Sequence, residues 1–218
     1  MKTLKTGLLA FTALAAAAAA PIAASVATSA SAQAAALSPA DQQLVAKAQA
    51  HLQSMTSVTG RFVQTDARGA VTKGTYYLQR PGKIRFEYDK PSGLLVVADG
   101  SNVNVHDRRL KTFDRYPLGR TPLSLFLAKS IRLDQGVRVS SVARTQDGFM
   151  LTARDAKRQA DGAITLVFAD AQAPRLKEWI VADAQGRRTR VQLASMQNAS
   201  LKSDLFVLRD PTRRTGRP

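Results

Sequence analysis

The chain has 218 residues, with 32 Lys and Arg against 16 Asp and Glu, a formal net charge of +16 and no cysteine. The missing cysteines exclude disulfides, thiolate zinc sites and a cysteine nucleophile. In a cytosolic protein, so strong a positive charge would indicate nucleic-acid binding.

Residues 1–34 have the segment order of a secretory signal peptide. Lys2 and Lys5 precede an apolar run over residues 8–20, and small residues offer a cleavage site after Ala32 or after Ala34. We therefore expect a cleaved signal peptide over residues 1–34 and a single exported domain over residues 35–218.

A transmembrane anchor is the alternative for this leader, but Pro21 breaks the apolar run, and small and polar residues follow it. No cysteine follows that could carry a lipid, so the chain should be released from the membrane. Loss of Lys2 and Lys5 lowers the formal charge from +16 to +14. Export argues against nucleic acid and leaves anionic membrane surfaces or acidic protein patches as partners. A merely solvated basic surface stays an open alternative.

The sequence predicts a helix of about four turns at the start of this domain. Ser38 is a suitable N-cap, Pro39 suits the first helical position, and Asp41 falls in the first turn. Apolar residues recur at helical spacing: Leu44, Ala48, Leu52 and Met55. Such an amphipathic helix must pack against another element.

Short strands joined by short polar turns follow and predict an antiparallel meander. The first five cover residues 57–66, 71–80, 83–89, 94–98 and 102–106. In the third, apolar Ile84, Phe86 and Tyr88 alternate with charged residues, so one face is apolar. The same alternation places Arg80 on the face of Tyr76 and Leu78, where a charge needs hydrogen-bond partners.

A short apolar helix is predicted in the middle of the chain, with Thr121 as its cap and Pro122 in its first turn. Its apolar residues are Leu123, Leu125, Phe126 and Leu127. Strands then resume over residues 137–144, 148–154, 164–170, 175–184, 188–196 and 204–208. The sequence thus predicts one domain of roughly ten strands and two helices.

The sequence offers little catalytic chemistry. His51 and His106 are the two histidines, and no nucleophile elbow, metal-spaced histidine pair or glycine-rich phosphate loop is present. We expect no enzyme, no catalytic residues, no metal and no cofactor. The two apolar helices could complete a packed core, or they could form a lid over an apolar cavity.

Several segments together resemble the periplasmic outer-membrane lipoprotein carrier family, LolA. They are "GRFVQ", "GTYYLQRP", "KIRFEY", "LLVVADG", "TPLSLFLAK", "LKEWIVADAQGRRTRVQL" and "DLFVL". The resemblance implies a mainly β fold, in which a strongly curved antiparallel sheet forms an open, incomplete barrel. An N-terminal helix and a short mid-chain lid helix close it.

The resemblance also implies a function. The family binds the acyl chains of lipoproteins in an apolar cavity and carries them through the periplasm from the inner to the outer membrane. Expected partners are acylated lipoproteins as cargo, a lipoprotein-releasing ABC transporter of the inner membrane, and an outer-membrane acceptor or membrane surface. We expect the carrier to be a monomer.

Site residues follow from the same resemblance. An arginine followed by proline, at the position of Arg80, reaches the lid helices in this family and holds the empty cavity shut; carbonyl groups of the lid would be suitable acceptors. The expected cavity lining is Phe62, Tyr76, Leu78, Ile84, Phe86, Tyr88, Leu95, Val97, Leu123, Phe126 and Leu127.

The chain departs from the family in its aromatic content. Phe86 stands where relatives often have tryptophan, and Asn104 and His106 stand where they often have aromatic residues. This predicts a cavity poorer in aromatic rings. The alternative function is a periplasmic lipid-sensing regulatory module of the RseB type, whose members usually carry a second domain. An acceptor of the LolB type would need a cysteine after the signal peptide.

Overall fold

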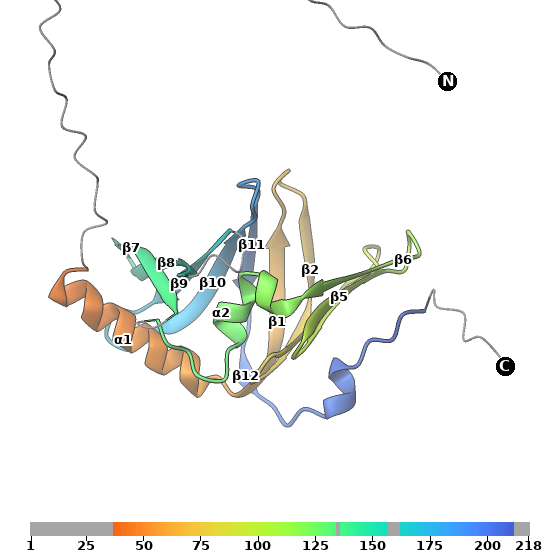
Figure 1. Cartoon of the computed structure of the whole chain (residues 1–218), viewed down its shortest axis with the longest axis horizontal. Helices are drawn as coiled ribbons and strands as arrows, with labels where there is room; N and C mark the ends of the chain where they lie inside the picture. The colour runs from red at the N-terminus through yellow and green to blue at the C-terminus, as the bar shows by residue number, and fades with distance from the viewer. Residues whose placement is uncertain (1–36, 134–135, 157–161, 212–218) are drawn as a thin grey trace, which may run out of the picture. The chain divides into compact units, whose positions relative to one another are not determined.

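The structure is a computed structural model that describes residues 37–133, 136–156 and 162–211 (Figure 1). The predicted signal peptide over residues 1–34 lies outside these ranges. No helix within them is long and apolar enough to cross a membrane.

Helix α1 (Pro39–Ser54) begins as the sequence predicts. The Ser38 hydroxyl oxygen accepts a hydrogen bond from the Asp41 amide at 3.1 Å, and Pro39 occupies the first turn, where its missing N–H is not needed. Leu44, Ala48 and Leu52 form its buried face. The helix therefore presents one apolar stripe to the rest of the protein.

The strands form one antiparallel sheet of 12 members. Its path runs β6-β5-β4-β3-β2-β1-β11-β10-β9-β8-β7, and the short β12 pairs with β1. Because β6 and β7 lie at opposite ends of this path, the sheet is open. The bounds are β1 (Ser57–Thr65), β2 (Val71–Gln79), β3 (Lys83–Tyr88), β4 (Leu94–Asp99), β5 (Asn102–Asp107), β6 (Thr112–Pro117), β7 (Val137–Thr145), β8 (Gly148–Asp155), β9 (Ala163–Ala169), β10 (Arg175–Ala182), β11 (Arg188–Leu193) and β12 (Gln197–Asn198). The predicted mainly antiparallel, open architecture with an N-terminal and a mid-chain helix is confirmed.

Two meanders meet at β1, which pairs with β2 on one side and with β11 on the other; Phe62 lies opposite Leu193 in the second pairing. The backbones approach closely here. A Cβ atom at Gly60 would collide with the carbonyl oxygen of Ser195, so glycine is the residue that fits.

Short helices connect and follow the strands. The mid-chain helix is α2 (Leu123–Leu127), preceded by the 3-10 turn η1 (Leu118–Arg120). Its N-cap is Pro122 rather than the predicted Thr121, whose hydroxyl donates to the Leu118 carbonyl at 2.9 Å. The threonine therefore closes η1 and does not cap α2.

Two predictions about strands are wrong. Residues 204–208 do not form a strand; Ser203–Phe206 is the 3-10 helix η2, which packs against the sheet. Strand β6 was not predicted, because its exposed sequence "TFDRYP" lacks an apolar alternation. It is held at the edge by pairing with β5.

The sheet has two unlike faces. We call the one under α1 and α2 the helix-covered face, where the large apolar cluster lies. On the opposite face, Leu95 and Val97 pack against Phe206, and we call these three residues the C-terminal cluster. Arg85 supports it by donating a hydrogen bond to the Leu205 carbonyl at 2.9 Å.

Candidate functional site: the apolar cluster under the helices

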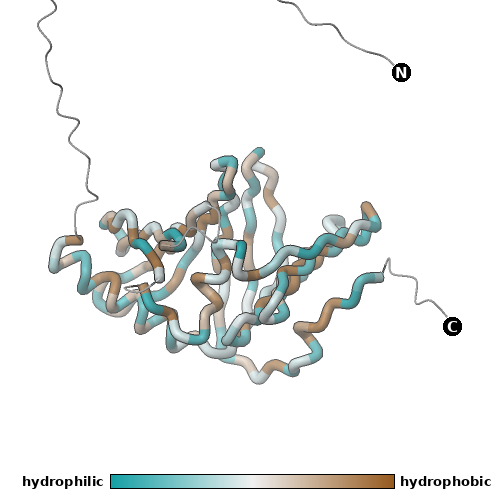
Figure 2. The backbone as a smooth tube through the Cα atoms, in the orientation of Figure 1, coloured by the Kyte–Doolittle hydropathy of each residue, from teal (hydrophilic) through white to brown (hydrophobic). Residues whose placement is uncertain are grey.

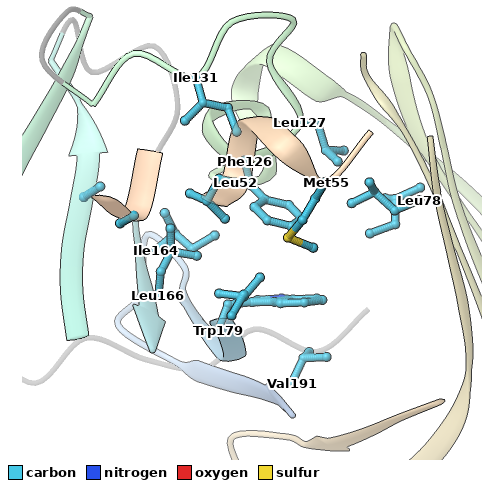
Figure 3. Close-up of a cluster of buried hydrophobic side chains, with 14 of the residues drawn as sticks. Leu52, Met55, Leu78, Phe126, Leu127, Ile131, Ile164, Leu166, Trp179 and Val191 are labelled. Atoms are coloured by element: carbon cyan, nitrogen blue, oxygen red, sulfur yellow. The ribbon is translucent and has the colours of Figure 1, made fainter. Parts of the chain in front are cut away.

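Most of the predicted lining residues come together on the helix-covered face. Figure 3 shows three of them, Leu78, Phe126 and Leu127, within the cluster. Each has almost no solvent exposure except Tyr88 and Leu123, which are partly buried. They are Phe62, Tyr76, Leu78, Ile84, Phe86, Tyr88, Leu123, Phe126 and Leu127. Residues from three adjacent strands and from α2 thus share one apolar region, which is the candidate binding site.

Cross-strand register explains this grouping. Tyr76 lies opposite Phe86, and Leu78 lies opposite Ile84, so these pairs project from the same face. Phe62 lies opposite Gly74, and a Cβ atom at that glycine would collide with the Phe62 ring. The glycine therefore makes room for the aromatic side chain.

Leu95 and Val97 do not belong to this region, and their predicted place in the lining is corrected. They lie opposite Glu87 and Arg85, the charged side of β3. Because side chains alternate along a strand, both point to the face that carries the C-terminal cluster.

Asn104 also lies on the opposite face, paired with Val97. Its side chain is buried and bridges two polar groups: it donates to Asp99 Oδ2 at 2.9 Å and accepts from Arg115 Nε at 2.9 Å. His106, opposite Leu95, has the same orientation. Neither residue replaces an aromatic ring under the helices, so the predicted lower aromatic content there rests on Phe86 alone.

Trp179 on β10 is the main residue that the sequence reasoning missed. The centre of its ring lies 5.4 Å from the ring centre of Phe126 (Figure 3) and 6.0 Å from that of Phe86. Trp179 therefore joins α2 to the first meander. The register of β10 shifts between Leu176 and Glu178. This irregularity lets both Leu176 and Trp179 face the cluster, which simple alternation forbids.

The cluster is closely packed in this structure. The Phe62 ring makes edge contacts with Phe86 at 5.2 Å and with Tyr88 at 5.1 Å. The Tyr88 hydroxyl donates to Gln64 Oε1 at 2.7 Å, and burial raises the pKa of Tyr88 to about 12.

Arg80 lies against α2, but its contacts differ from those expected. Its guanidinium carbon lies 4.9 Å from the centre of the Phe126 ring. The three guanidinium nitrogens are buried and have no hydrogen-bond partner among the residues that the structure describes. Burial lowers the pKa of Arg80 to about 10, so the group is charged at neutral pH.

The backbone supplies the hydrogen bond that was expected from the Arg80 side chain. In the turn after Arg80, the Gly82 amide donates to the carbonyl of Leu127, the last residue of α2, at 2.8 Å. The turn between β2 and β3 therefore contacts α2, the mid-chain lid helix, twice: through this hydrogen bond and through the Arg80–Phe126 contact. A pocket of about 270 Å³ lies beside this junction.

Helix α1 is fastened to the segment after α2. Gln53 Oε1 accepts from the Ile131 amide and Gln49 Oε1 from the Leu133 amide, both at 3.0 Å. Gln53 Nε2 also donates to the Lys129 carbonyl at 3.2 Å. Two glutamine side chains thus join the two covering segments.

His51 has contacts that hold it within the fold. His51 Nε2 accepts a hydrogen bond from the Leu176 amide at 3.0 Å, and its ring meets the edge of Phe168. Burial and, to a smaller extent, the charge of Arg80 lower the pKa of His51. Within the three described ranges, no group of three or more His, Asp or Glu side chains is placed to hold a metal ion.

The apolar face of one antiparallel sheet thus lies under α1 and α2. The family model described as "Outer membrane lipoprotein carrier protein LolA" matches residues 53–209. The chain therefore belongs to the LolA family, as its sequence resemblance suggested.

Similar proteins are named as outer-membrane lipoprotein carriers or as members of the LolA superfamily. An outer-membrane lipoprotein carrier protein of Methylibium petroleiphilum is 28% identical over 167 residues, covering 74% of this chain and 77% of its own. Another from Xanthomonas campestris pv. campestris is 30% identical over 164 residues, covering 71% and 78%. The solved LolA superfamily protein NE2245 of Nitrosomonas europaea is 13% identical, with a TM-score of 0.46 over 77% of this chain and 97% of its own.

Proposed function

We propose that the protein is a periplasmic carrier that binds the acyl chains of lipoproteins between the helix-covered face and helices α1 and α2. Membership of the LolA family supports this, since relatives are named outer-membrane lipoprotein carrier proteins. The observation that carries the proposal is the apolar cluster shared by strands and lid, into which the Arg80 guanidinium is buried.

Physical chemistry explains why such a carrier is needed. Exposing an acyl chain of roughly 16 carbons to water costs on the order of 12 kcal/mol, at ~0.8 kcal/mol per methylene. A lipoprotein with two or three chains cannot cross an aqueous gap at that cost. A protein that shields the chains must also release them, so its covering helices must open at a low cost.

The contacts of the lid are of a suitable size. Three hydrogen bonds described above join α1 to the segment after α2, and a fourth joins α2 to the β2–β3 turn. Each is worth ~0.5–1.5 kcal/mol net, and the Arg80–Phe126 contact is worth ~0.5–2 kcal/mol. Incoming acyl chains can displace these contacts if their burial gains a comparable free energy.

The route of transport belongs to the same proposal. The carrier receives acylated lipoproteins from a releasing ABC transporter of the inner membrane and delivers them to an acceptor or membrane surface at the outer membrane. It acts as a monomer, without a catalytic step or cofactor. The leader over residues 1–34 directs its export to the periplasm.

The test is to purify the exported protein and identify by mass spectrometry what accompanies it. Lipoproteins or their acyl chains are expected, together with release of a lipoprotein from inner-membrane vesicles by the added carrier. Failure to release lipoprotein and to bind a fluorescent fatty acid would overturn the proposal. Recovery of an anti-sigma factor instead would favour the sensing alternative.

A further inference from the structure

The turn between β5 and β6 exposes an apolar residue among positive charges. Leu110 is 63% exposed, the largest value among the exposed large hydrophobic side chains of the described residues. Arg108, Arg109 and Lys111 flank it and are exposed as well. We call residues 108–111 the hairpin tip. Its β5–β6 hairpin extends outward at the edge of the sheet, with hydrophobic and hydrophilic positions side by side at its end (Figures 1 and 2).

Hydrogen bonds to the backbone fix the shape of the hairpin tip. Asp107 Oδ1 accepts from the amides of Arg109 at 2.8 Å and Leu110 at 3.0 Å. The Arg108 amide donates to the Gly93 carbonyl at 3.3 Å, which joins the tip to the β3–β4 turn. Leu110 is therefore presented by an ordered turn.

The positive charge of the tip is not neutralised by ion pairs. Among the residues described, none of Arg108, Arg109 and Lys111 forms a salt bridge, and the Asp107 carboxylate is engaged by backbone amides. Lys90, in the adjacent turn, is exposed too. The local field is thus positive around one protruding leucine.

We propose that the hairpin tip docks on an anionic phospholipid surface, with Leu110 entering the interface and the three cations contacting headgroups. An aliphatic side chain surrounded by Lys and Arg is typical of interfacial membrane anchors. A protruding tip suits a deformable surface better than a protein pocket, and leucine is under-represented among protein-binding hot spots. This goes beyond carriage of lipoproteins, because it concerns how the protein itself meets a membrane.

The experiment measures flotation of the cargo-free mature protein with vesicles. The vesicles contain phosphatidylcholine alone or mixed with phosphatidylglycerol. We expect binding to the anionic mixture that weakens with added salt. R108S/R109S should weaken it by about 25-fold, at roughly fivefold per cation. L110S should weaken it by roughly tenfold.

Matched controls separate the tip from general charge. R138S/R154S removes the same charge from exposed residues on β7 and β8, toward the other edge of the sheet, and V207S changes an aliphatic side chain that is 58% exposed. Both should bind like the wild type, and circular dichroism should show that all variants fold.

Three outcomes would overturn the inference: no binding to anionic vesicles, equal loss in R138S/R154S, or unchanged binding of L110S. Absence of vesicle binding would direct attention to an acidic protein partner. Because no cargo is present, none of these outcomes bears on the proposed carrier function.

Discussion

Replacing Arg80 with leucine removes a buried charge and its contact with the lid. In the structure, the guanidinium packs on the Phe126 ring of α2, and its nitrogens lack hydrogen-bond acceptors among the described residues. An unsatisfied buried polar group costs ~1–3 kcal/mol, whereas the cation–ring contact stabilises by ~0.5–2 kcal/mol. The variant should therefore be more stable when empty, by about 1 kcal/mol, which raises Tm by about 2–4 °C.

The same substitution should impair delivery of cargo. Beside an acyl chain the guanidinium would stay buried, so the cost of its unpaired nitrogens is common to the empty and the loaded state. The chain would displace Phe126 from Arg80, so the Arg80–Phe126 contact alone distinguishes the two states and favours the empty one. Losing ~0.5–2 kcal/mol of that preference shifts the distribution about 2- to 30-fold toward the loaded state. Leucine also adds apolar surface next to the cargo. Arg80→Leu should accept lipoproteins and release them poorly.

A two-step assay separates the two effects, with lipoprotein release from inner-membrane vesicles first and transfer to acceptor membranes second. Arg80→Lys should be partly defective, because an ammonium keeps the charge but does not stack on the ring as a planar guanidinium does. Arg138→Leu, at an exposed position of β7, is the matched control. Delivery at the wild-type rate, or failure at uptake by a folded variant, would refute a role of Arg80 in holding the empty site closed. A fall in Tm by several degrees would refute the argument that the guanidinium is unpaired.

Three further changes test other parts of the structure. Phe86→Ala should lower the free energy of unfolding by roughly 2–4 kcal/mol, because the Phe86 ring packs between Phe62 and Trp179. It should also weaken binding of a fluorescent fatty acid. A large loss of Tm with intact binding would contradict a binding role for Phe86. Backbone amides lower the pKa of Asp66 and Asp170 from 3.8, so their stabilisation is present above that pH and is lost as pH falls through the lowered values. Urea titrations should show a loss of stability below about pH 4, in addition to the loss below about pH 6.5 that the lowered pKa of His51 predicts. Intact-mass measurement of the exported protein should give an N-terminus near Gln33 or Ala35, and an acylated N-terminus would overturn the signal-peptide prediction.

Regular alternation made part of the site predictable from sequence. Ile84, Phe86 and Tyr88 alternate with charged residues over a whole strand, and this fixed both the strand and its apolar face. Where both faces of a strand are apolar, the pattern cannot choose between them. Strand β4 is such a case, and only its pairing with Arg85 and Glu87 shows that Leu95 and Val97 face away from the helices.

Other features depend on tertiary contacts that no local pattern encodes. Trp179 reaches the cluster because the register shifts within β10, and one residue of shift exchanges the two faces. The sequence "DLFVL" has the composition of a strand, but its backbone folds into η2, with Phe206 buried against Leu95 and Val97. In both segments, tertiary packing determines the backbone conformation, because local propensity allows more than one.

The first meander separates the two proposed working parts of the protein. Successive antiparallel turns alternate between the ends of the strands, so the β2–β3 and β4–β5 turns lie at one end and the β5–β6 turn at the other. The lid is attached at the first end, where Gly82 bonds to Leu127 and the Ser101 carbonyl accepts from Leu118. The hairpin tip is at the second. Contact of the tip with a membrane would therefore leave the lid contacts intact. If the protein carries cargo as proposed, we expect release to need a separate event at the lid.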